Sequence, residues 1–169
     1  MRDYLTSHPT GRQLGLIMCL PLAESAMYVD ADVLFYPGAR ELARLVASES
    51  SSASFLQDCQ FAGDTRLIRA EREKQTPVNT GFLILRKPLD WSLGVARFLE
   101  LEGAPSFFTN QTITHLVMHA NGANALTREK FILELDDQCD YGDRHANADV
   151  AIRHYVNPVR HKFWTSLFP

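Results

Sequence analysis

Short apolar runs bounded by polar or turn-forming residues recur along this chain, and they predict buried strands. The first two runs are Ala26–Val29 and Gly81–Leu85. Two later runs, Phe131–Leu135 and Val150–Tyr155, are joined by the polar stretch Asp136–Asp149 and predict two further strands.

Apolar residues at helical spacing predict helices between these strands. The predicted helices are Gly11–Leu22 with a break at Pro21, Ala39–Ser48, a helix from Trp91 to Leu99 with Asp90 as its N-cap, Asn110–Ala120 ending near Asn121 and Gly122, and a last turn over His161–Phe168. Three polar segments, Met1–Thr10, Ser48–Ser54 and Glu71–Gln75, are expected to be irregular or exposed. Because strands and helices alternate, the pattern predicts an α/β layer architecture.

Composition excludes several classes of protein. The 169 residues fit a single domain, residues 1–169, that can bury a core. The net charge of -3 gives no basic surface for a nucleic acid, and no apolar run is long enough for a membrane span. Cys19, Cys59 and Cys139 are odd in number and far apart, which indicates reduced thiols and argues against a zinc site. Since the N-terminus has no signal-peptide pattern, we expect a cytoplasmic protein.

The most informative polar residues are Asp30 and Asp32, which follow the apolar run Ala26–Val29 directly. If the chain stays extended there, a period of two places both carboxylates on the same side. Two hard oxygen ligands at the end of a strand can hold a divalent cation that also binds a diphosphate. The alternative is a solvated turn or a helix cap, but paired carboxylates are costly beside a buried strand unless they have a partner.

Two other groups of ionisable residues have simpler explanations. His115 and His119 share one face of the predicted helix, but Leu116 lies where a zinc peptidase needs a glutamate, so a packed or exposed pair is favoured over zinc. The acidic residues of 136–143 are expected to form a solvated loop and not a second metal site.

Four segments carry a further signal when they are taken in order. They are Tyr28-Val29-Asp30-Ala31-Asp32 followed by Val33-Leu34-Phe35; Pro77 to Leu85 (PVNTGFLIL); Thr109-Asn110-Gln111-Thr112; and Arg153 to Trp164 (RHYVNPVRHKFW). The first resembles the metal-binding segment of GT-A fold glycosyltransferases, particularly the family-8-like group. The others resemble the Asn-x-Gly strand beneath the donor sugar, the acidic-Gln start of a helix, and the C-terminal His-Phe-x-Gly…Lys-Pro-Trp segment of that family.

The resemblance implies a metal-dependent glycosyltransferase that takes a nucleotide-diphosphate sugar and an unknown acceptor. It implies that Asp30, Asp32 and His154 bind the metal, and this mixed ligand set suits Mn²⁺, with Mg²⁺ as the alternative. It further implies the donor-binding residues, which are Asn79 and Gly81 at the floor of the sugar pocket, Gln111 on the sugar hydroxyls and Lys162 on the diphosphate. No catalytic base is assigned.

The chain also departs from the family. Asn157 replaces a glycine, Phe163 replaces a proline, and Asn110 replaces the acid before Gln111. About 29 residues precede Asp30, too few for the nucleotide-binding βαβ unit of a GT-A enzyme.

The resemblance therefore implies a partial GT-A fold, a mixed sheet flanked by helices, that lacks most of the base and ribose pocket. A non-catalytic relic or an assembly subunit that keeps the fold is the alternative function. The missing half also predicts an uncovered sheet edge or apolar face near Gly81–Leu85, and hence either self-association into a homo-oligomer such as a dimer or aggregation-prone behaviour.

Overall fold

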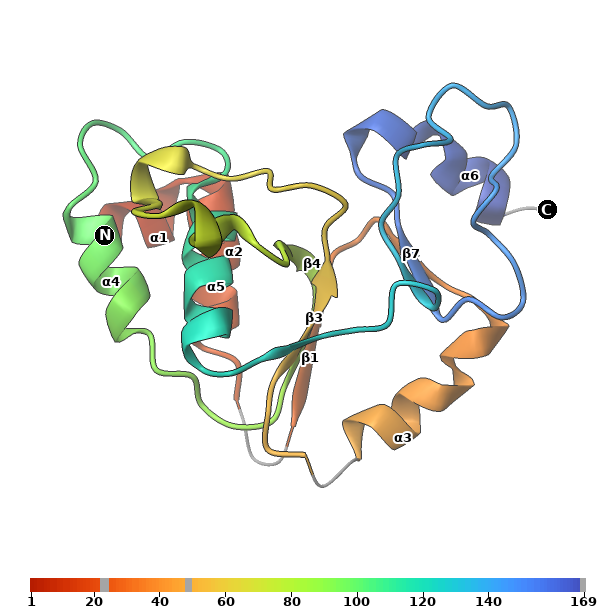
Figure 1. The fold of residues 1–169 in the computed structure, drawn as a ribbon, viewed down its shortest axis with the longest axis horizontal. Helices are drawn as coiled ribbons and strands as arrows, with labels where there is room; N and C mark the ends of the chain where they lie inside the picture. The colour runs from red at the N-terminus through yellow and green to blue at the C-terminus, as the bar shows by residue number, and fades with distance from the viewer. Residues whose placement is uncertain (22–24, 48–49, 168–169) are drawn as a thin grey trace.

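The structure is a computed structural model that describes residues 1–21, 25–47 and 50–167. These residues form six α-helices and two mixed β-sheets (Figure 1). The predicted α/β class is therefore confirmed at the level of a mixed α/β fold. No described helix has both the length and the apolar character that a membrane crossing requires.

The first sheet has four strands in the order β1-β4-β3-β5. Their bounds are β1 Ala26–Val29, β4 Val78–Leu85, β3 Ser54–Gln57 and β5 Asn124–Ala125. Strand β4 is antiparallel to both β1 and β3, and β3 is parallel to β5. All of β4 is buried, because it has a strand on each side and packed side chains on both faces.

The second sheet has three strands in the order β2-β7-β6, with β2 Val33–Phe35, β7 Ile152–His154 and β6 Phe131–Ile132. Strand β7 is antiparallel to β2 and parallel to β6. Since only three residues separate β1 from β2, the chain passes from one sheet to the other at residues 30–32.

The helices form two groups: four lie on one side of the first sheet, and two short ones lie beside the second sheet (Figure 1). The first group is α1 Arg2–Ser7, α2 Pro9–Met18, α4 Ser92–Leu99 and α5 Thr109–Ala120; the second is α3 Leu42–Val46 and α6 His161–Leu167. Short 3₁₀ turns are η1 Pro37–Glu41, η2 Thr65–Leu67, η3 Glu71–Lys74 and η4 Asn157–Val159.

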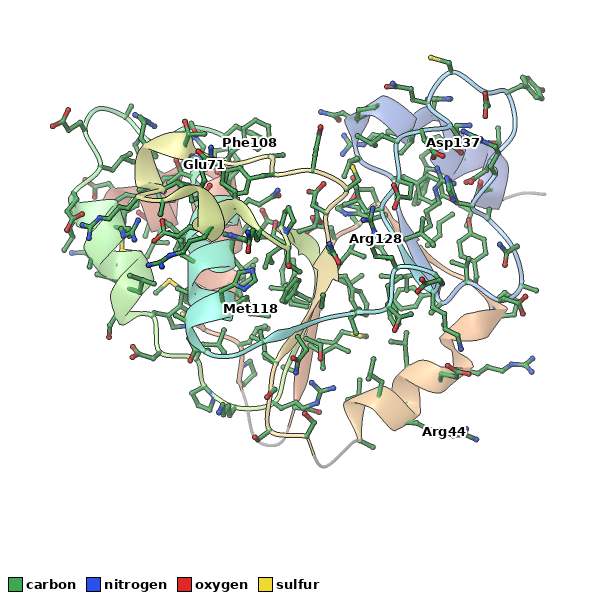
Figure 2. The ribbon with its side chains drawn as sticks, in the orientation of Figure 1. Arg44, Glu71, Phe108, Met118, Arg128 and Asp137 are labelled. Carbon is green, nitrogen blue, oxygen red and sulfur yellow. The ribbon has the colours of Figure 1, made fainter. Side chains whose placement is uncertain are left out.

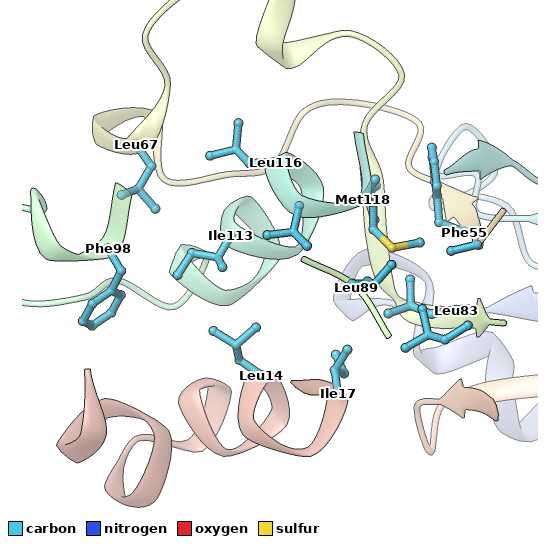
Figure 3. Close-up of a cluster of buried hydrophobic side chains, with 14 of the residues drawn as sticks. Leu14, Ile17, Phe55, Leu67, Leu83, Leu89, Phe98, Ile113, Leu116 and Met118 are labelled. Carbon is cyan, nitrogen blue, oxygen red and sulfur yellow. The ribbon is translucent and has the colours of Figure 1, made fainter. Parts of the chain in front are cut away.

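Two apolar clusters form the core, and they use alternate residues of β4. Leu83 and Leu85 face the helices and pack in the cluster of Figure 3, which includes Leu14 of α2 and Ile113 of α5. Phe82 and Ile84, together with residues of the second sheet and α3, belong to the other cluster. The alternation follows from the period of two of a β-strand.

The predicted strand Ala26–Val29 matches β1 in its bounds, but β1 is partly exposed and not buried as predicted. Helix α5 ends where predicted, at a turn in which Gly122 has φ +67°. Strand β4 extends the predicted Gly81–Leu85 back to Val78. The ladders β6 and β7 are shorter than the apolar runs that predicted them. The predicted positions Leu22, Ser48, Glu49 and Phe168 lie outside the described residues.

The prediction of an irregular Met1–Thr10 is wrong, since α1 and the start of α2 occupy it. Tyr4 is buried there, with its ring stacked on Phe98 at 5.2 Å. Gly11 allows the two helices to touch, because a Cβ at this position would lie 1.9 Å from the carbonyl oxygen of Tyr4. A tertiary contact thus orders a segment whose own apolar pattern is weak.

The predicted uncovered edge near Gly81–Leu85 is not β4 itself, which has a strand on each side. Strand β3 pairs with β4 along one side. It was not predicted, because it begins at the end of the serine-rich sequence 48–54. Among the described residues, the free edge of this sheet next to β4 belongs to β1.

Candidate metal centre

Asp30, Asp32 and His154 come together although β7 lies far from β1 in the sequence. One ligand atom from each lies within 4.8 Å of the others. His154 Nε2 is 3.0 Å from Asp32 Oδ1 and 3.9 Å from Asp30 Oδ2. The ladder between β2 and β7 explains the meeting, because it pairs His154 with Val33, the residue after Asp32.

The two carboxylates do not lie on an extended chain, as the sequence argument assumed. Val33 N–H donates to the carbonyl of Asp30 at 3.3 Å, so residues 30–33 form a turn between the sheets. The turn still directs both carboxylates to His154, and β1 and β2 fix its two ends.

Asn79 and Gly81 of β4 set the orientation of the His154 ring. Asn79 Oδ1 accepts hydrogen bonds from Gly81 N–H and from His154 Nδ1, both at 2.9 Å. An amide oxygen only accepts, so Nδ1 carries a proton, and Nε2 faces Asp32 at 3.0 Å, where a metal ion could take the place of a proton. A Cβ on Gly81 would lie 2.2 Å from His154 Cε1. In this structure the glycine therefore makes room for the imidazole ring.

The carboxylates have different surroundings and different proton affinities. Burial raises the pKa of Asp30, although a hydrogen bond from the Tyr28 hydroxyl opposes this. Burial also disfavours the charged form of Asp32, but His154 and Arg160 outweigh it and hold the pKa at about 2. A divalent cation would relieve the unfavourable charge on Asp30, which is the usual role of a bound ion beside buried carboxylates.

These side chains lie at a pocket of about 300 Å³ between the two sheets. From α5, Gln111 donates to Asp58 and to the carbonyl of Ala62. Asp58 also accepts from Asn79 at 3.0 Å, so Gln111 and His154 belong to one hydrogen-bonded network. The structure thus places Asn79 and Gln111 at the pocket, while Gly81 contacts it only through His154.

Lys162 is the predicted site residue that the structure places elsewhere. Its side chain is fully buried, with Nζ 3.3 Å from Asp137 and bonded to the carbonyls of Asp140 and Gly142. It does not line the pocket. The cation that does so is Arg160, which is exposed and donates to Asp32 at 2.6 Å.

The acidic residues of 136–143 form a more buried structure than the predicted solvated loop. Asp137 is fully buried and pairs with the buried Arg153, which also contacts Asp143. Asp136, Asp137 and His145 can be grouped as metal ligands by distance, but Arg153 and Lys162 already neutralise Asp137. This charge pairing explains the cluster without an ion.

The sequence favoured a packed or exposed pair over zinc, and the structure buries His115 and leaves His119 exposed. His115 Nδ1 accepts from Val78 N–H, and Nε2 bonds to the carbonyl of Glu73. Both ring nitrogens are engaged, so this histidine has no free atom for zinc.

The site also contains four residues that the sequence did not predict as part of it: Arg160, Asp58, Tyr28 and Gln13. Gln13 lies on α2 and donates to Asp30 at 3.0 Å, and Asn110 donates to Gln13 at 2.6 Å. A signal was present for Arg160, which lies in the quoted C-terminal segment, and for Tyr28, which lies two residues before Asp30 on β1. No local pattern marks Gln13 or Asp58.

Searches of known protein families and of curated proteins find no match to this chain.

Proposed function

We propose that this chain is a metal-dependent glycosyltransferase domain that binds the diphosphate of a nucleotide-diphosphate sugar at Asp30, Asp32 and His154. The observation that carries the proposal is the convergence of these three side chains around one point, with His154 Nε2 turned toward the carboxylates by Asn79. The resemblance to GT-A enzymes supplies the reaction class, and the fold of this family remains part of the proposal.

The donor set fits Mn²⁺ or Mg²⁺, which would be held by Asp30, Asp32 and the imidazole of His154. When bound, such an ion neutralises charge on a departing diphosphate. In the reaction, an acceptor hydroxyl oxygen forms a bond to the anomeric carbon and releases its proton. The bond from that carbon to the phosphate oxygen breaks, and its electron pair leaves with the nucleoside diphosphate.

The other residues of the pocket have roles that follow from their chemistry. Arg160 lies beside Asp32, so its guanidinium is available to a phosphate that approaches the metal site. Asn79 holds His154, and Gln111 presents its amide beside Asp58 in the same pocket. We propose Arg160 as the phosphate contact in place of Lys162.

A thermal-shift series tests this function with Mn²⁺, Mg²⁺, pyrophosphate, UDP and GDP, alone and in pairs. We expect stabilisation by about 1 kcal/mol when Mn²⁺ and a diphosphate are both present at several times their dissociation constants. Because no base pocket is expected, UDP and GDP should act about equally. Strong preference for one base would mean that the chain holds a base pocket.

Asp32→Asn is the informative variant, and Asp136→Asn is its matched control. Each removes one carboxylate charge from a group of two aspartates and one histidine. The shift with Mn²⁺ should vanish in Asp32→Asn and persist in Asp136→Asn. Arg160→Gln should keep the response to Mn²⁺ and lose most of the additional response to pyrophosphate. An equal response to Mn²⁺ in wild type and Asp32→Asn would overturn the metal site.

The second candidate is a non-catalytic subunit that keeps the fold, and one observation favours it. The described residues before β1 form α1 and α2 and contain no strand, so they do not build a strand–helix–strand nucleotide unit. This candidate predicts no metal-dependent response to any diphosphate and no hydrolysis of a nucleotide sugar.

A further inference from the structure

Two exposed aromatic residues lie at the same pocket and have no role in the metal centre. Phe107 and Phe108 are 65% and 43% exposed, and both line the pocket. Their rings are 5.3 Å apart at 87° to one another, so they form a corner and not a parallel slot. Figure 2 shows Phe108 at the first turn of α5, on the side of the molecule away from α6 and Asp137.

The loop that carries these rings is held firmly by polar contacts. Buried Asp64 accepts from Thr109 Oγ1 at 2.7 Å and from Ser106 Oγ at 3.1 Å, and these residues flank the two phenylalanines. Arg66 pairs with Asp64 and donates to the carbonyls of Glu102 and Ala104. The rings are therefore exposed by a fixed backbone, and adjacent exposed aromatic rings at a pocket are typical of a binding surface.

Outside the metal centre, the lining of this pocket is uncharged. The charged or titratable lining residues are Asp30, Asp32, Asp58, His154 and Arg160, and all belong to the hydrogen-bonded network of the metal centre. The rest of the lining is apolar or carries hydroxyls and carboxamides, including Gln60, Gln111 and Asn157. Carboxamides both donate and accept, which suits hydroxyl groups and gives no attraction for an anion.

Position links the rings to the proposed transfer. Phe108 is the N-cap of α5, and Gln111 follows three residues later on the same helix face. Arg160 belongs to the segment between η4 and α6 and thus reaches the pocket from the second sheet. A diphosphate at Arg160 and the metal would leave the α5 side of the pocket for the group that receives the sugar.

We infer that Phe107 and Phe108 form the acceptor subsite and that the acceptor is a neutral carbohydrate. The apolar C–H groups of a sugar ring contact the aromatic corner, and the sugar hydroxyls bond to the carboxamides beyond it. The acceptor role rests on the proposed function, whereas binding of the saccharide does not need the metal.

Saturation-transfer NMR on the full chain tests the inference, in EDTA and without nucleotide. The probes are neutral trisaccharides of glucose, xylose and N-acetylglucosamine, with uridine, guanosine and an uncharged serine peptide as the competing classes. We expect at least one trisaccharide to bind through its C–H protons, and its dissociation constant to rise by about tenfold in the double variant Phe107→Ala/Phe108→Ala. Tyr141→Ala is the matched control, because this aromatic residue is fully exposed outside the pocket, and it should bind as wild type does.

Other results would contradict either the carbohydrate subsite or its role in binding the acceptor. The carbohydrate subsite would be overturned if no trisaccharide binds, or if the dissociation constant is unchanged in the double variant. It would also be overturned if a nucleoside or the peptide binds instead of a trisaccharide and loses its binding in the double variant. The response to Mn²⁺ and pyrophosphate, measured on the same double variant, reports on the proposed function separately. If that response is absent from wild type while a saccharide binds at the two rings, the subsite stands and the acceptor role falls.

Discussion

At the scale of single residues, the candidate metal centre depends on a glycine that is not itself a metal ligand. Gly81 leaves the space that the His154 ring fills, and Asn79 fixes the proton on the far nitrogen of that ring. The partners of a ligating histidine control its tautomer and orientation, and their loss typically weakens metal binding by about 10–100-fold. The sequence resemblance placed Gly81 under a sugar, but its contact in the structure is the imidazole.

Gly81→Ala should therefore weaken Mn²⁺ binding by about 10–100-fold, because the new Cβ displaces the ring from the carboxylates. Gly142→Ala is the control, since a Cβ there meets nothing within 4 Å. Titration of each folded variant with Mn²⁺, followed by electron paramagnetic resonance of the free ion, gives the affinity. Equal affinity in Gly81→Ala and wild type would contradict the assigned role of the glycine.

At the scale of elements, continuous apolar runs predicted the strands, and tertiary contacts decided the rest. Strands β1 and β4 follow from the apolar runs Ala26–Val29 and Gly81–Leu85, but only β4 is buried, because β1 lies at the edge of the sheet. Strand β3 was not predicted, because its only apolar residues are Phe55 and Leu56 and a serine precedes them. It forms a strand because it pairs with β4. Asp30, Asp32 and His154 were found from a family motif, but their distance depends on a ladder between β2 and β7 that no local pattern specifies.

Lys162 and Arg160 of the C-terminal segment lie close together in the sequence but differ in burial. Lys162, on the first turn of α6, pairs with the buried Asp137, which also pairs with Arg153 of β7. These charges link the helix to the strand. Arg160 precedes the helix and stays exposed at the pocket. Spacing within the motif does not report burial, so it could not distinguish the buried Lys162 from the exposed Arg160 as the proposed phosphate contact.

Lys162→Met should lower the free energy of unfolding by about 3 kcal/mol, because it leaves buried carbonyls and part of the charge of Asp137 without a partner. The stabilisation by Mn²⁺ and pyrophosphate should remain. Arg160→Met should show the opposite pattern, with little loss of stability and a weakened response to pyrophosphate. Urea unfolding with and without ligands measures both, and loss of the pyrophosphate response in Lys162→Met alone would restore the original assignment.

Helix α5 carries a histidine that should make stability depend on pH. Burial disfavours the charged imidazole of His115 and places its pKa below the ordinary 6.5. The unfolded chain therefore binds more protons as the pH falls below about 6.5, so the stabilising contribution is complete above that value and decreases below it.

We expect the free energy of unfolding to fall between pH 7 and pH 5.5 in wild type, and to fall less in His115→Gln. Glutamine keeps an acceptor for Val78 N–H and a donor for the carbonyl of Glu73, but it does not titrate. Urea unfolding at several pH values measures the difference. The same pH dependence in both proteins would assign the effect to other groups.

At the scale of the whole molecule, the pocket depends on both sheets. Residues of α2, β4 and α5 reach it from the first sheet and its helices, and His154 and Arg160 reach it from the second. The turn at residues 30–33 connects the two and carries both carboxylates. A ligand that binds all of these groups would hold the two sheets together, which is how a pocket between layers converts binding into stability.

The exposed surface of the first sheet determines what we expect for self-association. Since β4 is internal, we expect the homo-oligomer that the sequence predicted to form at β1, the edge strand next to β4; the opposite edge of this sheet, β5, has only two residues. Met27 of β1 is 40% exposed, and an unprotected edge with an apolar side chain is a surface on which a second copy can pair. The strand is short, so the pairing should be weak and visible only at high protein concentration.

Met27→Lys should remove this association, because a two-fold pairing of β1 with its copy brings the two lysines into the same interface. Leu99→Lys is the control, since Leu99 is 71% exposed on α4 and belongs to no strand edge. In sedimentation velocity over a concentration series, wild type and Leu99→Lys should shift toward a dimer, while Met27→Lys stays monomeric. A wild-type monomer at every concentration would exclude the edge as an interface, and an unchanged dimer in Met27→Lys would place the interface on another surface.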